Sequence, residues 1–174
     1  MSIKKFAVLA FTLGLSAGAI AQAPDIATLS TPIVGNQGQA IGKADFQGGA
    51  HGTVVRIAVQ PGGLTPGWHG IHFHAVGDCA DTAKFEASKS HVNHAQKKHG
   101  LLNPDGPDEG DLPNIYAAAD GSVNAEVSSP TLLKGAKGLQ DADGSALIIH
   151  ANADDHHTQP IGGAGARVGC AVIK

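Results

Sequence analysis

Short segments in which hydrophobic and polar residues alternate recur along the chain. In 53–59, the side chains of Val55, Ile57 and Val59 occupy every second position, which is the period of a half-buried β-strand. Several short strands separated by glycine-rich turns predict an all-β fold, an antiparallel sandwich or barrel. Four further segments have strand character: 26–34, 39–46, 145–150 and 168–173.

A β-hairpin is predicted in the second half of the chain. The segments 114–119 and 122–127 flank the dipeptide Asp120-Gly121. Asp-Gly between two strand-like runs is a strong signal for a two-residue hairpin turn.

Two long segments, 75–113 and 151–166, follow neither the strand nor the helix period. Loops of this length are uncommon in compact domains and are usually functional. Residues 22–174 contain no linker, repeat or low-complexity tract and are expected to form one domain.

Composition supports this interpretation and excludes several classes. The chain of 174 residues contains 24 Gly and 9 Pro, which disfavours a helical bundle. Hydrophobic residues make up 42% and charged residues 16%, which argues against disorder. Lys and Arg number 12 against 15 Asp and Glu, so a basic nucleic-acid surface is not expected.

The first 21 residues have the three-part pattern of a secretory signal peptide. Lys4 and Lys5 precede the uncharged apolar run 6–20, and Ala19-Ile20-Ala21 is a small-x-small cleavage pattern. A membrane anchor is a weaker alternative that the sequence leaves open. We expect residues 22–174 to be periplasmic or secreted and, after removal of the signal, not associated with a membrane.

The expected export predicts the oxidation state of the two cysteines, Cys79 and Cys170. An even pair in an oxidising compartment usually forms a disulfide. Closing so long a loop could stabilise the fold by roughly 4–5 kcal/mol in the chain-entropy model.

The 10 histidines require a chemical explanation. His72 and His74 are two positions apart, so on a strand both rings point to one face and can reach one metal ion. The alternative is a pair of surface histidines. His150 ends an apolar run, where a histidine is more often a satisfied core residue than a ligand.

A second group lies within the first long segment. His91, His99, Asp108 and Asp111 follow the spacing H-x7-H-x8-D-x2-D. Two imidazoles with carboxylates suit a tetrahedral zinc site, and a solvated polar loop is the alternative.

Two longer motifs indicate a known protein family. Segment 70–79, GIHFHAVGDC, and segment 162–173, GGAGARVGCAVI, resemble the two signatures of the copper/zinc superoxide dismutases. The GDLPN run at 110–114 and the spacing between His150 and Asp154 match as well. The resemblance implies a Greek-key β-sandwich or barrel with two long functional loops.

The resemblance also implies roles for individual residues. His91 would bridge the two metals, and it shares catalysis with Arg167, the arginine beside the copper. Asp154 would hydrogen-bond His72 on the copper side and His99 on the zinc side, and Cys79 and Cys170 would form the family's disulfide. The implied copper ligands are His72, His74, His91 and His150, and the implied zinc ligands are His91, His99, Asp108 and Asp111.

The chain departs from the family pattern at Asp108, where a histidine is expected. The Nδ1 atom of a histidine and a carboxylate oxygen of an aspartate are both three bonds from Cα, so Asp108 can reach the same metal. His94 lies near and is a possible substitute. The remaining histidines are not expected to bind metal. His69 is expected to be structural, and His51, His156 and His157 are expected to be exposed to solvent.

These observations predict a superoxide dismutase that uses copper redox cycling, with one copper and one zinc and with the superoxide anion as its substrate. A copper-only dismutase with an empty zinc site is one alternative, and a non-catalytic periplasmic copper-binding or delivery module is another. A nucleic-acid partner is not expected. The sequence does not fix the oligomeric state, for which a homodimer is one hypothesis.

Overall fold

The computed structural model describes residues 26–174, and the predicted signal segment lies outside them. The described residues contain nine strands and a single 3-10 turn, and they contain no α-helix. The elements are β1 (Ala27–Gly35), β2 (Ala40–Gly49), β3 (Gly52–Val59), β4 (Gly67–His69), β5 (Ile71–His74), η1 (Glu86–Ser88), β6 (Ile115–Ala117), β7 (Val123–Ser129), β8 (Ser145–His150) and β9 (Arg167–Ile173).

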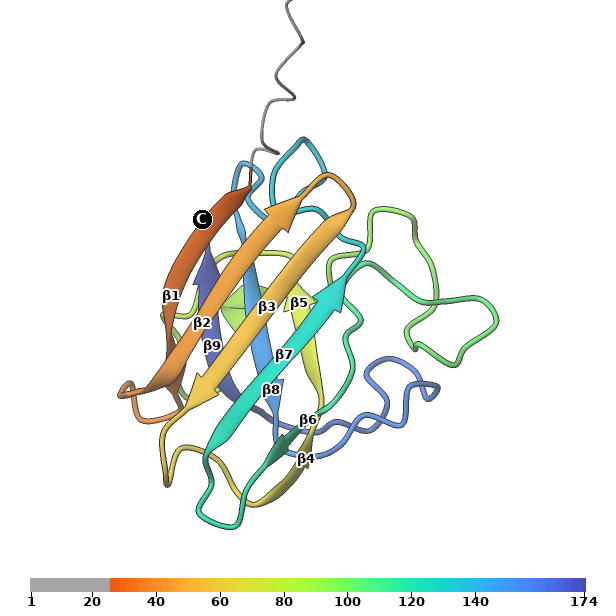
Figure 1. Ribbon diagram of the computed structural model, residues 1–174. Helices are drawn as coiled ribbons and strands as arrows, with labels where there is room; N and C mark the ends of the chain where they lie inside the picture. Colours follow the sequence, from red (N-terminus) through yellow and green to blue (C-terminus); the bar gives the residue numbers. More distant parts are fainter. Residues whose placement is uncertain (1–25) are drawn as a thin grey trace, which may run out of the picture.

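Seven strands form one curled antiparallel sheet in the order β5-β8-β9-β1-β2-β3-β7. In Figure 1, β1, β2, β3 and β7 form the front layer, and β9, β8 and β5 lie behind it. The predicted all-β antiparallel sandwich is therefore confirmed, and the predicted strands at 26–34, 39–46, 53–59, 145–150 and 168–173 correspond to β1, β2, β3, β8 and β9.

The core between the layers follows from the period-two pattern. Val55, Ile57 and Val59 on β3 are buried, and they pack in one apolar cluster with Phe46 of β2 and Ile33 of β1. Burying each side chain of this size contributes about 1.5–3 kcal/mol. The alternate positions of β3 face outward, so the strand can have only one register.

The predicted hairpin at 114–127 is wrong in its pairing. Both strands exist, as β6 and β7, but β6 pairs with β4 and β7 pairs with β3. A turn does form at Asp120-Gly121, but it spans the three residues 119–121 and not the expected two. Ala118 N donates to Ser122 O and Gly121 N donates to Ala118 O, each at 2.8 Å, and Gly121 has a positive φ of 80°. The strands separate after the turn because each finds a longer-range partner, which the local sequence does not reveal.

Both long segments are loops, as predicted, and they project from the same side of the sandwich in Figure 1. Cys79 in the first loop and Cys170 on β9 form a disulfide, with a Cα–Cα distance of 5.9 Å. Cys170 lies in a small second core with Phe85 and Ile148. The disulfide therefore ties the first loop to the middle of β9.

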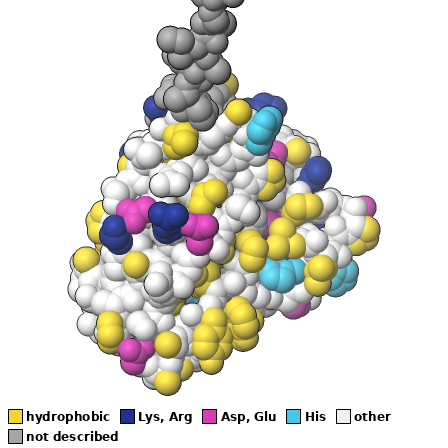
Figure 2. All heavy atoms as spheres, in the orientation of Figure 1, with side chains coloured by type: hydrophobic (Ala, Val, Ile, Leu, Met, Phe, Trp, Pro, Cys, Tyr) yellow, Lys and Arg dark blue, Asp and Glu magenta, His cyan; other side chains and the backbone are white. Residues whose placement is uncertain are grey.

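The outer face of the front layer is polar. Figure 2 shows basic and acidic side chains side by side over this sheet. The ion pairs Lys43–Asp45 and Arg56–Glu126 join neighbouring positions at 2.8 and 2.6 Å. These exposed charges largely neutralise one another. Among residues 26–174, no helix is long and apolar enough to cross a membrane.

Candidate metal centre

Strand β5 presents two histidines on one face. All four of its residues are buried, and Ile71 and Phe73 belong to the main apolar core. His72 and His74 alternate with them and therefore point the other way, with ring centroids 6.5 Å apart. The sequence interpretation of this pair is correct in its geometry, and the surface alternative is wrong.

His150 comes to the same place from strand β8, which pairs with β5. Its ring lies 4.8 Å from that of His72 and 5.9 Å from that of His74. The pairing of β8 with β9 shifts register at this point, so that His150 lies opposite Arg167. Such an irregularity redirects side chains, and here it brings the arginine to the histidine cluster.

His91 completes this group from the first long loop. It forms an isolated β-bridge with His74, which fixes the loop beside β5. Its ring centroid is 4.2 Å from that of His72 and 5.3 Å from that of His99. His91 therefore stands between a group of histidines and a second, more acidic group.

Each histidine of the first group has a buried ring nitrogen without a hydrogen-bond partner among the described residues. Leaving such a group unpaired costs about 1–3 kcal/mol, so a natural fold keeps it for a reason. His72, His74 and His150 have potential ligand atoms within 4.8 Å of one another, and the ring of His91 lies beside those of His72 and His74. Imidazole nitrogens gathered in this way are a donor set that suits copper. The unpaired atoms are His72 Nδ1, His74 Nε2, His91 Nε2 and His150 Nε2.

The other ring nitrogen of these residues is held by the protein. His74 Nδ1 donates to Lys89 O at 2.7 Å, and His150 Nδ1 donates to Gly165 O at 3.0 Å. His72 Nε2 donates to Asp154 Oδ2 at 2.8 Å. These bonds fix the tautomers so that the unpaired nitrogens carry a lone pair toward the centre of the group.

The second group consists of His91, His99, Asp108 and Asp111, all buried, with potential ligand atoms within 4.8 Å of one another. His91 Nδ1 lies 3.0 Å from Asp108 Oδ2, and His99 Nδ1 lies 2.5 Å from Asp111 Oδ1. Two imidazoles and two carboxylates fit a tetrahedral zinc ion. His94 is exposed and is not part of this group.

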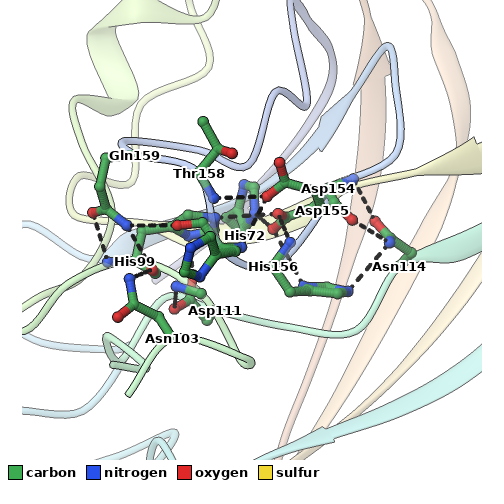
Figure 3. Close-up of polar contacts among 12 residues, drawn as sticks. His72, His99, Asn103, Asp111, Asn114, Asp154, Asp155, His156, Thr158 and Gln159 are labelled. Atoms are coloured by element: carbon green, nitrogen blue, oxygen red, sulfur yellow. Dashed lines mark hydrogen bonds and ion pairs between the residues drawn. The ribbon is translucent and has the colours of Figure 1, made fainter. Parts of the chain in front are cut away.

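Asp154 joins the two groups from the second long loop. Its carboxylate accepts hydrogen bonds from His72 Nε2 at 2.8 Å and from His99 Nε2 at 3.2 Å, and these contacts are drawn in Figure 3. Burial would raise the pKa of Asp154, but these bonds outweigh burial and hold the pKa well below its usual range. Asp154 is therefore ionised between two histidine rings.

No site role was predicted from the sequence for three residues of this network. They are Asn114, which ends the matching run at 110–114, Gln159, and His156, which is half-buried where a solvated position was expected. The side chain of Asn114 both donates to Asp154 O and accepts from Asp154 N, each at 2.8 Å. The side chain of Gln159 likewise accepts a hydrogen bond from His99 N at 3.1 Å and donates one to His99 O at 2.8 Å (Figure 3). His156 N donates to Asp154 Oδ1 at 2.6 Å. Partners 40 and 60 positions apart leave no local signal.

Arg167 lies at the rim of the site. Its guanidinium donates to Phe85 O at 2.6 Å, to Lys89 O at 2.8 Å and to Ser88 Oγ at 3.1 Å. Burial lowers the pKa of Arg167 from its usual value, but an arginine remains charged at neutral pH. It has no carboxylate partner among the described residues, so its charge is available to an anion.

A cavity of about 310 Å³ opens above both groups and is lined by His74, His91, Lys97, Asp108 and Arg167, among others. A small anion that enters this cavity meets the arginine and the histidine cluster together. Lys97 adds a second basic side chain to the wall, from the first loop.

His69 has a different role from its neighbours. Its Nδ1 contacts His150 O at 2.6 Å and its Nε2 contacts Thr65 O at 2.8 Å. Both ring nitrogens are occupied, so His69 is a structural residue, as the sequence indicated.

Comparison with known proteins agrees with this geometry. The family model for copper/zinc superoxide dismutase matches residues 40–173. The chain belongs to the copper/zinc superoxide dismutase family. Members of this family bind copper and zinc, and the two groups of buried ligand side chains provide places for both metals.

Several relatives and solved structures are similar to the chain. It is 58% identical over 129 residues to the Cu-Zn superoxide dismutase of Caulobacter vibrioides, covering 71% of this chain and 72% of that protein. The solved Cu/Zn superoxide dismutase of Brucella abortus is 29% identical, with a TM-score of 0.69 over 85% of this chain and 100% of that one. A double mutant of a SOD-like protein from Bacillus subtilis is 38% identical, with a TM-score of 0.78 over 83% and 95%.

The electrostatics of the metal-free site differ between the two groups. Burial is the main cause that lowers the pKa of His72, of His74 and of His150, the last to about 3. Burial also acts to lower the pKa of His99, but hydrogen bonds to Asp111 and Asp154 outweigh it and raise the pKa to about 10. His99 is therefore protonated at neutral pH in the metal-free protein.

Zinc binding should strengthen as the pH rises. Below a pKa of about 10 a proton occupies His99, and zinc must displace it. The zinc affinity should therefore rise about tenfold per pH unit between roughly pH 6 and pH 9, for one displaced proton. Competition against a zinc chelator at several pH values measures this slope, with the exposed-histidine variant His51→Ala as the control. A zinc affinity that does not change with pH would contradict a protonated His99.

Proposed function

We propose that this chain is an exported superoxide dismutase with one copper and one zinc ion. His72, His74, His91 and His150 would hold the copper. His91, His99, Asp108 and Asp111 would hold the zinc. The observation that carries the proposal is a cluster of four neighbouring buried imidazole rings, each with a nitrogen that has no partner among the described residues.

The bound copper supplies the redox chemistry, since it can take an electron from one superoxide and give it to the next. The protein residues supply a neutral ligand set for it. Burial lowers the pKa of His72, His74 and His150, so these rings stay unprotonated and open to a metal at neutral pH. Imidazole suits copper in both oxidation states.

Arg167 would capture and orient the substrate. Superoxide is a small anion, and a fixed cation beside the copper ligands raises its local concentration. Carbonyls of Phe85 and Lys89 hold the guanidinium in place, and Lys89 O also orients His74. One short segment of backbone thus positions the arginine relative to a copper ligand.

His91 would carry the proton that peroxide formation requires. It is the one residue common to the two proposed ligand sets, with Nε2 toward the copper group and Nδ1 toward the zinc group. Nε2 can hold a proton while Nδ1 stays bound in the second group. The ring can then deliver that proton without leaving its place.

Both alternative functions lack a specific supporting observation. A copper-delivery module does not require an arginine aimed at the cavity, and Arg167 is there. A copper-only enzyme does not require four convergent ligands in the second group. The homodimer and the lack of a nucleic-acid partner stay predictions.

Export would follow from the pattern at residues 1–21, which would leave residues 22–174 as the mature domain in the periplasm or outside the cell. The disulfide between Cys79 and Cys170 supports an oxidising compartment. Expression of the full chain in a bacterial host should give a periplasmic protein whose first residue is Gln22. A protein retained in the cytosol with Met1 intact would contradict export.

Loss of one copper ligand should abolish dismutation without unfolding the protein. His74→Ala removes an unpaired nitrogen from the copper group, and activity should fall by more than about 100-fold, beyond the usual effect of an outer partner. Copper content, superoxide consumption and circular dichroism are measured together. His51→Ala, which removes an exposed histidine, is the control and should match the unaltered protein. Near-normal activity of a copper-loaded His74→Ala protein would disprove the ligand assignment.

Removal of the arginine charge should slow the reaction and make it less sensitive to salt. Arg167→Ala should lower the second-order rate constant by about tenfold or more, since electrostatic attraction of substrate raises on-rates on this scale. Salt screens such attraction, so the variant should lose part of its salt dependence. Arg167→Lys keeps the charge and should retain part of both effects. Rates unchanged at low and at high salt would exclude Arg167 from substrate capture.

A further inference from the structure

The two neighbouring ligand groups differ in chemical type. The first offers four imidazole nitrogens, His72 Nδ1 and the Nε2 atoms of His74, His91 and His150. The second offers the imidazoles of His91 and His99 and two carboxylates. The geometry points to Asp108 as a selectivity residue that keeps reduced copper out of the second group. This inference rests on the proposed copper and zinc sites.

Selectivity is needed because the groups are so close. They share His91, and the rings of His72 and His99 are 5.4 Å apart. A copper ion that reaches the cavity therefore has both groups within a few ångströms. The separation of the two groups is too small to direct each metal to its own site, so the discrimination has to come from the types of ligand.

The ligand types provide that discrimination for Cu(I). Imidazole binds copper well, whereas carboxylates prefer hard divalent ions and are poor ligands for the soft Cu(I) ion. Zinc accepts both donor types in a tetrahedral site. In the proposed dismutation the bound copper would be Cu(I) in one of its two oxidation states, and a neighbouring site with three imidazoles would compete for that ion. With two imidazoles and two carboxylates, the second group favours zinc.

Asp108 is held in position to act in this way. Its Oδ1 accepts a hydrogen bond from Gly110 N at 2.9 Å, and its Oδ2 lies 3.0 Å from His91 Nδ1. The residue is only 6% exposed. One oxygen is thus fixed by the backbone and the other is directed at the shared histidine.

The second carboxylate has a different function. Asp111 accepts hydrogen bonds from the backbone N–H groups of Gly100 and Asp108 at 2.7 and 3.0 Å, so it also shapes the loop. Asp108 accepts only one backbone N–H bond, from Gly110, so a change of donor type at Asp108 should affect the fold less than a change at Asp111. Asp108 also lines the cavity of about 310 Å³, which leaves room for a larger ring.

The test is an anaerobic titration of the metal-free, disulfide-bonded protein with Cu(I) buffered by a chelator. Chelator absorbance and elemental analysis after desalting give the copper bound per chain. The unaltered protein should bind about one Cu(I), and Asp108→His should bind close to two, because the second group then contains three imidazoles. Asp105→His replaces an exposed aspartate of the same loop and should bind about one, like the unaltered protein.

Two results would overturn the inference: an unaltered protein that binds two Cu(I) ions, or an Asp108→His protein that still binds one. A parallel zinc titration separates this failure from failure of the proposed function. An unaltered protein that binds no Cu(I) would refute the copper site, and one that binds no zinc would refute the zinc site. An unaltered protein that binds zinc in the zinc titration and two Cu(I) ions in the copper titration would refute only the selectivity.

Discussion

One constraint governs the first group of histidines: the buried imidazoles of His72, His74 and His150 must each have one nitrogen bonded to the protein and the other left free. The acceptors that hold the first nitrogen are Lys89 O, Gly165 O and the carboxylate of Asp154. All three lie in the two long loops, whereas three of the rings belong to β5 and β8. The centre therefore exists only when both loops are closed against the sheet, and a bound metal offsets the cost of the unpaired nitrogens.

The loops are closed by a few long-range contacts. The disulfide of Cys79 holds the first loop near Phe85 and Lys89, whose carbonyls fix Arg167. The side chains of Asn114 and Gln159 form hydrogen bonds with backbone groups of the opposite loop. These bonds hold the two loops together where no strand pairing does. The disulfide, the two loops and the proposed metal ligands thus form one connected unit. The outer sheet face, with its paired charges, takes no part in it.

The two metal groups differ because their acids are distributed unequally. Asp154 contacts both groups, but it serves as a hydrogen-bond acceptor of the rings. Asp108 and Asp111 belong to the second group only. Hydrogen bonds to Asp111 and Asp154 outweigh burial and raise the pKa of His99, whereas burial lowers the pKa of His150. Four neutral imidazole rings suit copper, whose charge changes between Cu(I) and Cu(II), whereas the acidic group suits zinc, which stays divalent.

The sequence by itself determined most of the strands, the two long loops and the chemical types of the proposed ligand residues, although it did not predict β4. Alternation in 53–59 and the pair His72 and His74 are local signals, since side-chain direction on a strand depends only on position. Only the tertiary structure decided that the 114–127 hairpin divides between two sheets and that Asn114 and Gln159 lock the loops. It also decided which nitrogen of each ring stays free. Those outcomes depend on partners far away in the chain, and their energies arise only when the sandwich has closed around them.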